Sequence, residues 1–244
     1  LDGCAFRMAA LLRLLSPSPN SRLLTPELRE AIAEACIGHI YWLTEPGEEH
    51  MCFCTENHQI IHHTNELLAG QLFPDRVFTN NGQTGRWHRE HAEKMIARWL
   101  DWRIRFGYSE WNSNCYYDED LTPLLNLADF AEDQEVAGRA AMLLDLMFFD
   151  MAVDSFRGAY GTSHGRTYPA HVLSGHTEAT SAAQKIAWGL GTFHNPNNMT
   201  AVCLATSPRY RVPATIEALA QDLPAEFENR ERQAFDLEEA AALG

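Results

Sequence analysis

Residues 136–151, with the sequence VAGRAAMLLDLMFFDM, decide the fold class of this chain. Their apolar side chains recur every three or four positions, which is the spacing that places them on one face of an α-helix. The residues of this face are Val136, Ala140, Leu143, Leu144, Met147, Phe148 and Met151. Through about residue 155 no segment alternates apolar and polar residues as a half-buried strand does. The pattern predicts an all-α protein.

The same helical spacing recurs on both sides of this stretch. A helix over residues 25–43 is expected to begin with Thr25 as its cap and Pro26 in its first turn. Further helices are predicted over residues 6–15, 60–72, 95–106, 121–128 and, more weakly, 177–190. Gly107 is the expected stop of the helix that precedes it. Residues 218–243 are acidic and alanine-rich, which is typical of a peripheral helix or a frayed tail.

Helices that follow one another without strands build a bundle, a solenoid or a closed ring of helical hairpins. No motif repeats at a fixed period, and the loops 44–56, 74–86 and 107–120 are long enough to carry function. We expect a helical-hairpin domain over residues 1–175 and a C-terminal extension over residues 176–244. Because an apolar helical pattern is already running soon after Leu1, we expect further domains in a longer chain.

Composition narrows the classes of function. The chain has 244 residues, 45% of them hydrophobic, so it can bury a large core. Its net charge of -14 argues against nucleic-acid binding, which needs a basic face. No apolar run reaches the roughly 18 residues that span a bilayer, so we expect a soluble protein. The six cysteines lack CxxC pairs and are expected to be buried thiols. The compartment stays open.

A first polar cluster stands where the helix over residues 60–72 should begin. It consists of Thr55, Glu56, Asn57, His58 and Gln59. Unpaired backbone N–H groups and the positive end of the helix dipole favour an anionic substrate group there. The alternative is that Glu56 and Asn57 complete the helix cap and that His58 is an ordinary histidine.

Two further clusters lie in segments of loop composition. The loop 108–120 combines aromatic, amide and carboxylate side chains, the inventory that holds sugars; its candidate residues are Trp111, Asn112, Asn114, Tyr116 and Tyr117. The alternative is a solvated loop in which Asp118 or Asp120 caps the next helix. Residues 157–168 are rich in glycine, and they carry His164, Arg166 and Tyr168.

Histidine pairs raise the question of a metal site. His88 and His91 are three positions apart, whereas the helical zinc motif has two histidines four positions apart with a glutamate between them. His62 and His63 are adjacent, so they point to different sides of a helix. We therefore expect neither a metal ion nor another cofactor.

The Glu56-Asn57-His58-Gln59 step at the start of a helix, followed by Leu67, Leu68 and Gly70, resembles the α/α-toroid polysaccharide lyases and the heparinase-like helical domains. Tyr116 and Tyr117 stand at a similar distance after it as the tyrosine of those families. The resemblance covers roughly residues 25–170. It implies antiparallel helical hairpins that form part of an α/α toroid, and an acidic polysaccharide as substrate. A secreted or periplasmic location would accompany that activity.

The resemblance also implies a role for each residue. Asn57 would bind the uronate carboxylate and stabilise the charge that builds when the neighbouring proton leaves. His58 or a tyrosine would take this proton, and Tyr117 or Tyr116 would protonate the leaving glycosidic oxygen. Arg166 or His164 would neutralise the acid group. Glu56, Gln59, Trp111, Asn112, Asn114 and Tyr168 would contact the sugar.

Two other functions fit the same sequence. A glycoside hydrolase on a helical fold needs two carboxylates across the scissile bond, and Glu56, Glu110 and Asp118 are the candidates. A non-catalytic carbohydrate-binding or scaffold domain needs none of these residues for chemistry.

Overall fold

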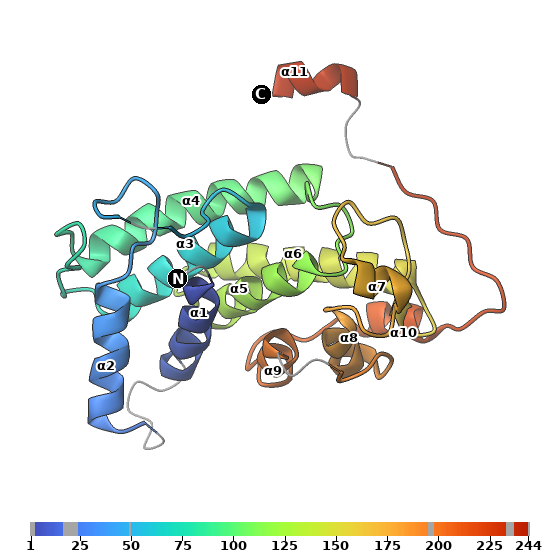
Figure 1. Ribbon diagram of the computed structural model, residues 1–244, viewed down its shortest axis with the longest axis horizontal. Coiled ribbons are helices and arrows are strands. Elements are labelled where there is room, and N and C mark those ends of the chain that lie inside the picture. Colours follow the sequence, from blue (N-terminus) through green and yellow to red (C-terminus); the bar gives the residue numbers. More distant parts are fainter. Residues whose placement is uncertain (1–2, 17–23, 49, 195–197, 233–236, 244) are drawn as a thin grey trace. The chain divides into compact units, whose positions relative to one another are not determined.

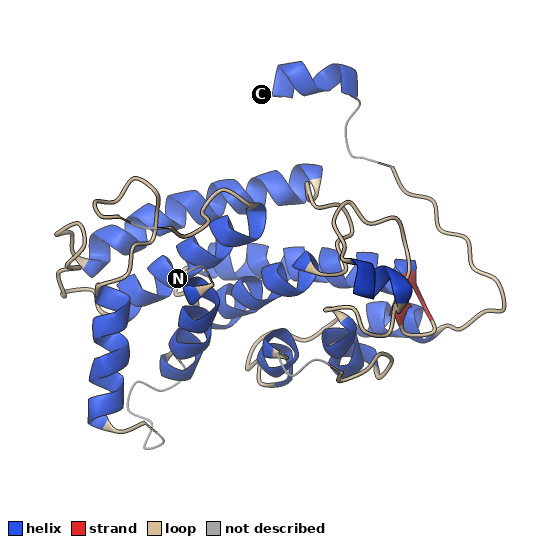
Figure 2. Ribbon diagram, viewed as in Figure 1, coloured by secondary structure: helices blue, strands red, loops and turns tan. Residues whose placement is uncertain are grey.

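The computed structural model describes residues 3–16, 24–48, 50–194, 198–232 and 237–243. In these residues the chain is mostly helical, which confirms the all-α prediction (Figure 2). The described strands are β1 (Ser155–Phe156) and β2 (Ala159–Tyr160), which pair antiparallel. Their turn uses Arg157 and Gly158, both with a left-handed φ, of 54° and 82°. None of the described helices is long and apolar enough to cross a membrane.

The chain divides into two compact units, and each is discontinuous in sequence. Figure 1 labels the helices and colours them by their position in the sequence. The first unit comprises residues 1–99 and 122–141, and the second comprises residues 100–121 and 142–244. Three long helices run from one unit into the other: α4 (Gly85–Phe106), α5 (Tyr116–Phe130) and α6 (Gln134–Asp154). The boundary expected near residue 175 falls inside the second unit.

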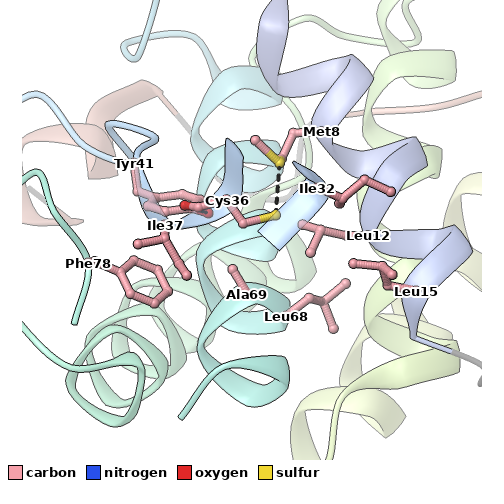
Figure 3. Packing of buried hydrophobic residues seen from close by; sticks show 10 residues of the cluster. All are labelled: Met8, Leu12, Leu15, Ile32, Cys36, Ile37, Tyr41, Leu68, Ala69 and Phe78. Atoms are coloured by element: carbon pink, nitrogen blue, oxygen red, sulfur yellow. Dashed lines mark hydrogen bonds between the residues drawn. The ribbon is translucent and has the colours of Figure 1, made fainter. Parts of the chain in front are cut away.

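The core of the first unit lies among α1 (Cys4–Leu15), α2 (Pro26–Ile37) and α3 (Glu56–Leu72). Figure 3 shows its buried side chains, which are Met8, Leu12, Leu15, Ile32, Cys36, Ile37, Tyr41, Leu68, Ala69 and Phe78. Thr25 caps α2 as predicted, because its hydroxyl accepts a hydrogen bond from the Leu28 N–H at 3.3 Å.

The prediction of one helix over residues 25–43 was wrong at its C-terminal end. Helix α2 ends at Ile37, and Gly38 follows as its C-cap. Beyond it the chain turns so that Tyr41 enters the core and donates a hydrogen bond to the Cys36 carbonyl at 2.8 Å. In this loop Tyr41 is fully buried whereas Leu43 is 56% exposed, so the apolar residues that follow Gly38 do not mark a helix face.

A buried ion pair connects α1 to α5 within the first unit. The Arg13 guanidinium donates to Asn126 Oδ1 at 2.9 Å and to Asp129 Oδ2 at 2.8 Å. It also lies over the Phe130 ring. Since the Asp129 side chain is fully buried, loss of the arginine would leave an uncompensated charge in the core.

Helices α3 and α4 approach each other so closely that only glycine fits at two positions. A Cβ atom on Gly70 would lie 2.6 Å from the Gly85 carbonyl oxygen and 2.8 Å from the Arg89 nitrogen. A Cβ atom on Gly85 would likewise collide with the Phe73 carbonyl. These glycines set the spacing between the polar faces of the two helices.

We predict that Gly70→Ala lowers the free energy of unfolding by about 1–3 kcal/mol, because the added methyl group must push backbone atoms apart. The matched control is Gly138→Ala in α6, where a Cβ atom would meet no atom within 4 Å. Alanine's higher helix propensity should make that change stabilising by up to about 1 kcal/mol. Chemical denaturation of both variants measures the difference; equal effects would contradict the close-approach argument.

In the second unit α5 begins at Tyr116, five residues before the predicted start at Leu121. Asp118 and Asp120 therefore lie inside the helix, and the prediction that one of them caps it was wrong. Instead, the Tyr116 N–H donates to Ser113 Oγ at 3.1 Å. Helix α4 also begins ten residues earlier than the predicted residue 95, and it ends before Gly107 as expected.

The rest of the second unit consists of short helices. They are α7 (Pro169–Leu173), α8 (Ser181–Trp188), α9 (Met199–Ala205), α10 (Ala214–Gln221), the 3-10 helix η1 (Leu237–Glu239) and α11 (Ala240–Leu243). Helix α8 confirms the weak helix expected over residues 177–190. Part of the acidic tail expected over residues 218–243 lies outside the described residues.

Candidate functional site

The structure joins the two polar loops of the second unit that the sequence presented separately. The Ser113 hydroxyl donates to the Arg166 carbonyl at 2.8 Å, and the Thr167 hydroxyl donates to Asn114 Oδ1 at 2.7 Å. The Gly165 N–H donates to the Trp111 carbonyl at 2.7 Å. Because these bonds tie the start of α5 to residues 165–167, candidates about fifty residues apart form one site.

Three of the candidates meet on the surface of this site. The hydroxyls of Tyr116 and Tyr168 lie 2.7 Å apart, and Arg166 Nη2 lies 3.4 Å and 3.5 Å from them. The guanidinium also stands over both rings, about 5 Å from their centroids. Tyr168 is 43% exposed. We call these three side chains the phenol–guanidinium cluster.

The two phenols of the cluster have pKa values that move in opposite directions. Hydrogen bonds from Tyr116 and then Arg166 lower the pKa of Tyr168, since they stabilise its phenolate. Burial and the hydrogen bond to Tyr168 raise the pKa of Tyr116. A pair of ionisable groups with pKa values shifted apart is typical of an acid–base pair.

Tyr117, in contrast, is buried, with 2% of its surface exposed. Its hydroxyl donates to Asn112 Oδ1 at 3.3 Å. Asn112 is itself buried and has a left-handed φ of 43°. Its backbone carbonyl accepts a hydrogen bond from His164 Nδ1. Tyr117 and Asn112 therefore occupy the interior of the site, and the half-buried His164 lies against them. Tyr116 is the more accessible phenol of the predicted pair.

Carboxylates that the sequence reasoning missed surround this interior. Asn112 Nδ2 donates to Asp154 Oδ2 at 3.1 Å and to Glu231 Oε2 at 3.0 Å. Burial, followed by the negative charges of Glu231 and Asp154, raises the pKa of Asp150 to about 7. Burial likewise raises the pKa of Asp154 to about 6. The spacing of Asp150 and Asp154 by one helical turn was the available signal.

We predict that the free energy of unfolding of the wild-type protein falls, relative to that of Asp150→Asn, as pH rises from about 4 to about 7. In this window the unfolded chain releases the Asp150 proton while the folded protein keeps it. Since one pKa unit corresponds to about 1.4 kcal/mol, the relative loss should reach a few kcal/mol. Denaturation at several pH values, with exposed Asp101→Asn as control, tests this; parallel curves would contradict it.

The first predicted cluster lies in the first unit, at the start of α3. The Thr55 hydroxyl contacts both Asn57 Oδ1, at 2.5 Å, and His58 Nδ1, at 2.6 Å. A hydroxyl has one proton, so if it donates to Asn57, the His58 Nδ1–H must donate to it. His58 Nε2 is then the unprotonated nitrogen, which is the form that a general base requires.

Asn57 is fully buried, and its Nδ2 has no hydrogen-bond partner among the described residues. Thr55 occupies the N-cap position of α3, but its side chain binds Asn57 and His58 in place of the backbone. Glu56 is 5% exposed, and its carbonyl accepts from Trp99 Nε1 at 3.0 Å. Gln59 Nε2 donates to the Cys54 carbonyl at 3.2 Å.

A second constellation in the first unit centres on Glu66 of α3, which is fully buried. Its carboxylate meets the Nδ1 atoms of three histidines: His63 at 3.3 Å, His88 at 2.9 Å and His91 at 2.9 Å. Burial alone would raise the pKa of Glu66, but the three imidazoles outweigh it and lower the value to about 2. The contact with Glu66 raises the pKa of His91.

Two sets of side chains around Glu66 have donor atoms close enough to share a cation. In each set the three candidate ligand atoms lie within 4.8 Å of one another. One set is His63, Glu66 and His91, and the other is Glu45, Glu66 and His88. The prediction that no metal ion binds was based only on the spacing of histidines within one helix. Glu45 and Glu66 were therefore missed. The pairing of His63 with Glu66 one turn later was a readable signal.

No family model, curated protein or solved structure matches this chain.

Proposed function

We propose that this chain is a carbohydrate-active enzyme that cleaves a uronic-acid-containing polysaccharide by β-elimination, with the phenol–guanidinium cluster as its reactive group. The main support is the exposed contact of Tyr116 with Tyr168 under one arginine. Elimination beside a carboxylate needs a base, an acid and a positive charge, and this cluster offers all three. The proposal includes the ring architecture, with these helices as part of an α/α toroid.

Tyr168 is the base in this scheme, because its neighbours lower its pKa and stabilise its phenolate. Its oxygen takes the proton from the carbon next to the uronate carboxylate. The electron pair of that C–H bond forms the new C=C bond as the bond from the β-carbon to the glycosidic oxygen breaks. The leaving oxygen receives a proton from Tyr116.

The geometry also supplies a way to reset the two phenols. After the reaction Tyr168 is protonated and Tyr116 is a phenolate. The 2.7 Å contact between their oxygens lets the proton return directly. Arg166 remains charged throughout and stabilises the phenolate on either oxygen. Both oxygens lie in one cluster, so proton abstraction and leaving-group protonation occur on the same face of the sugar.

Asn57 and His58 belong to the first unit. Their predicted roles, which are carboxylate binding and proton abstraction, are therefore a separate hypothesis. The unpartnered Asn57 Nδ2 is a donor suited to a carboxylate oxygen, and His58 Nε2 is suited to proton transfer. The mechanism assigned to the phenol–guanidinium cluster does not depend on them.

We predict that Tyr168→Phe lowers kcat on a susceptible acidic polysaccharide by at least about 100-fold, as expected for loss of a general base. Tyr116→Phe and Arg166→Ala should also lower kcat. The exposed Arg157→Ala, in the same unit, is the control and should leave kcat unchanged. The measurement is the ultraviolet absorbance of the unsaturated uronate product, with circular dichroism to check folding.

Other outcomes point to the alternatives. New reducing ends without ultraviolet absorbance would replace elimination by hydrolysis, and Asp150, Asp154 and Glu56 would become the residues to substitute. Binding of polysaccharide without any cleavage would favour a carbohydrate-binding domain. Full activity of Tyr168→Phe would remove the proposed base.

A further inference from the structure

We infer that the first unit binds one divalent transition-metal ion through Glu45, Glu66 and His88, with Zn²⁺ or Mn²⁺ as the fitting class. His88 is the central residue of this site. This side chain is fully buried between two acceptors, Glu66 Oε1 at 2.9 Å and Asn81 Oδ1 at 3.1 Å.

The orientation of the Asn81 amide is fixed by a third group. Its Oδ1 accepts a hydrogen bond from the Gln83 backbone N–H at 3.0 Å, which an amide NH₂ group could not do. His88 Nε2 must therefore carry a hydrogen and donate it to Asn81. A neutral His88 then presents the bare lone pair of Nδ1 to the carboxylate of Glu66.

Two lone pairs 2.9 Å apart repel each other unless a positive charge lies between them. That charge is carried by either a proton or a metal ion. Glu45 favours the metal ion, because it places a third ligand atom within 4.8 Å of those of Glu66 and His88. A proton is shared by two such atoms, whereas a metal ion can be bound by all three.

Hydrogen bonds from neighbouring groups orient the three ligand side chains, as is typical of metal sites. A histidine ligand typically donates its other N–H to an oxygen, as His88 does to Asn81. Glu45 accepts hydrogen bonds from Asn80 Nδ2 at 2.7 Å and from the Tyr41 N–H at 3.3 Å. His63 and His91 act as donors that orient Glu66.

The alternative set of His63, Glu66 and His91 lacks this support. His63 Nε2 is buried without a hydrogen-bond partner among the described residues, so His63 lacks the oxygen acceptor that Asn81 provides for His88. We therefore assign the ion to the set with Glu45. Glu45 also lies on the wall of a pocket of about 330 Å³, together with Trp42 and Phe53, through which water or an ion can reach it.

The ligand types select the class of ion. Two carboxylates and one imidazole suit Zn²⁺, Mn²⁺ and Fe²⁺, and the absence of thiolate from this set disfavours Cu⁺. The site belongs to the first unit and takes no part in the elimination proposed for the phenol–guanidinium cluster.

The test is direct binding to the full chain after treatment with a chelator. Isothermal titration with Zn²⁺ alone and with Mn²⁺ alone should show one ion per chain, and the ion should raise Tm. Glu45→Gln and His88→Gln should weaken binding by about 100-fold or more, since loss of a group behind a ligand already costs 10–100-fold. Glu48→Gln and His50→Gln, two exposed changes of the same types in the same unit, should bind as the wild type does.

Three results would overturn the inference. They are failure of the wild-type chain to bind either ion, binding that saturates only above one ion per chain with no effect on Tm, and unchanged affinity in Glu45→Gln. If His88→Gln does not fold, the partly exposed Glu45→Gln and the wild-type titration still decide the question. Since the readout is binding, loss of polysaccharide cleavage plays no part in it.

Discussion

A carboxylate that water cannot reach must be surrounded by donors or cations, and Glu66 imposes this condition on the whole first unit. Its three imidazole neighbours come from two helices, so α3 and α4 must hold a fixed spacing and rotation for all three to reach it. The contact of Gly70 with Gly85 provides that spacing. The core of α1, α2 and α3 in turn keeps α3 in place.

In the second unit, hydrogen bonds join two polar loops that are distant in sequence. Ser113 does this with one hydroxyl, because it accepts from the first turn of α5 and donates to the backbone at Arg166. Helix α5 thereby fixes the position of Tyr116. The start of the same helix binds the segment that carries Arg166, which fixes Arg166 beside it. The buried Tyr117 and Asn112, together with the half-buried Asp154, form a hydrogen-bonded chain that connects the start of α5 to the end of α6.

Local periodicity was sufficient to predict the helices, because their apolar faces repeat along the sequence. It failed beyond Gly38, where apolar residues continue after helix α2 has ended and the buried one, Tyr41, lies in a loop. The start of α5 was missed because Ser113 accepts the hydrogen bond from its first residue. Asp118 and Asp120 are also residue types that cap helices, and they were chosen in place of Ser113. The three polar clusters were recognised from composition.

What could not be predicted is which clusters meet. The joining of Trp111 to Gly165 and of Asn114 to Thr167 depends on contacts across more than fifty residues, and no local pattern contains them. Glu66 was overlooked because it stands among leucines on an apolar helix face, where a charge contradicts the pattern that identified the helix. Such a contradiction is itself a signal, since a buried charge must have partners.

The division into two units has a consequence for how the protein can be made. Each unit consists of two segments, and the segments of the two units alternate along the chain. Neither unit is therefore contiguous in sequence. During synthesis the ribosome delivers residues 100–121 of the second unit before the last segment of the first. Until α5 has emerged, Arg13 of α1 lacks Asn126 and Asp129, the α5 residues to which it donates hydrogen bonds. The nascent chain therefore carries an incomplete first unit until residues 122–141 have been made, and exposed apolar surface of that kind is what chaperones recognise.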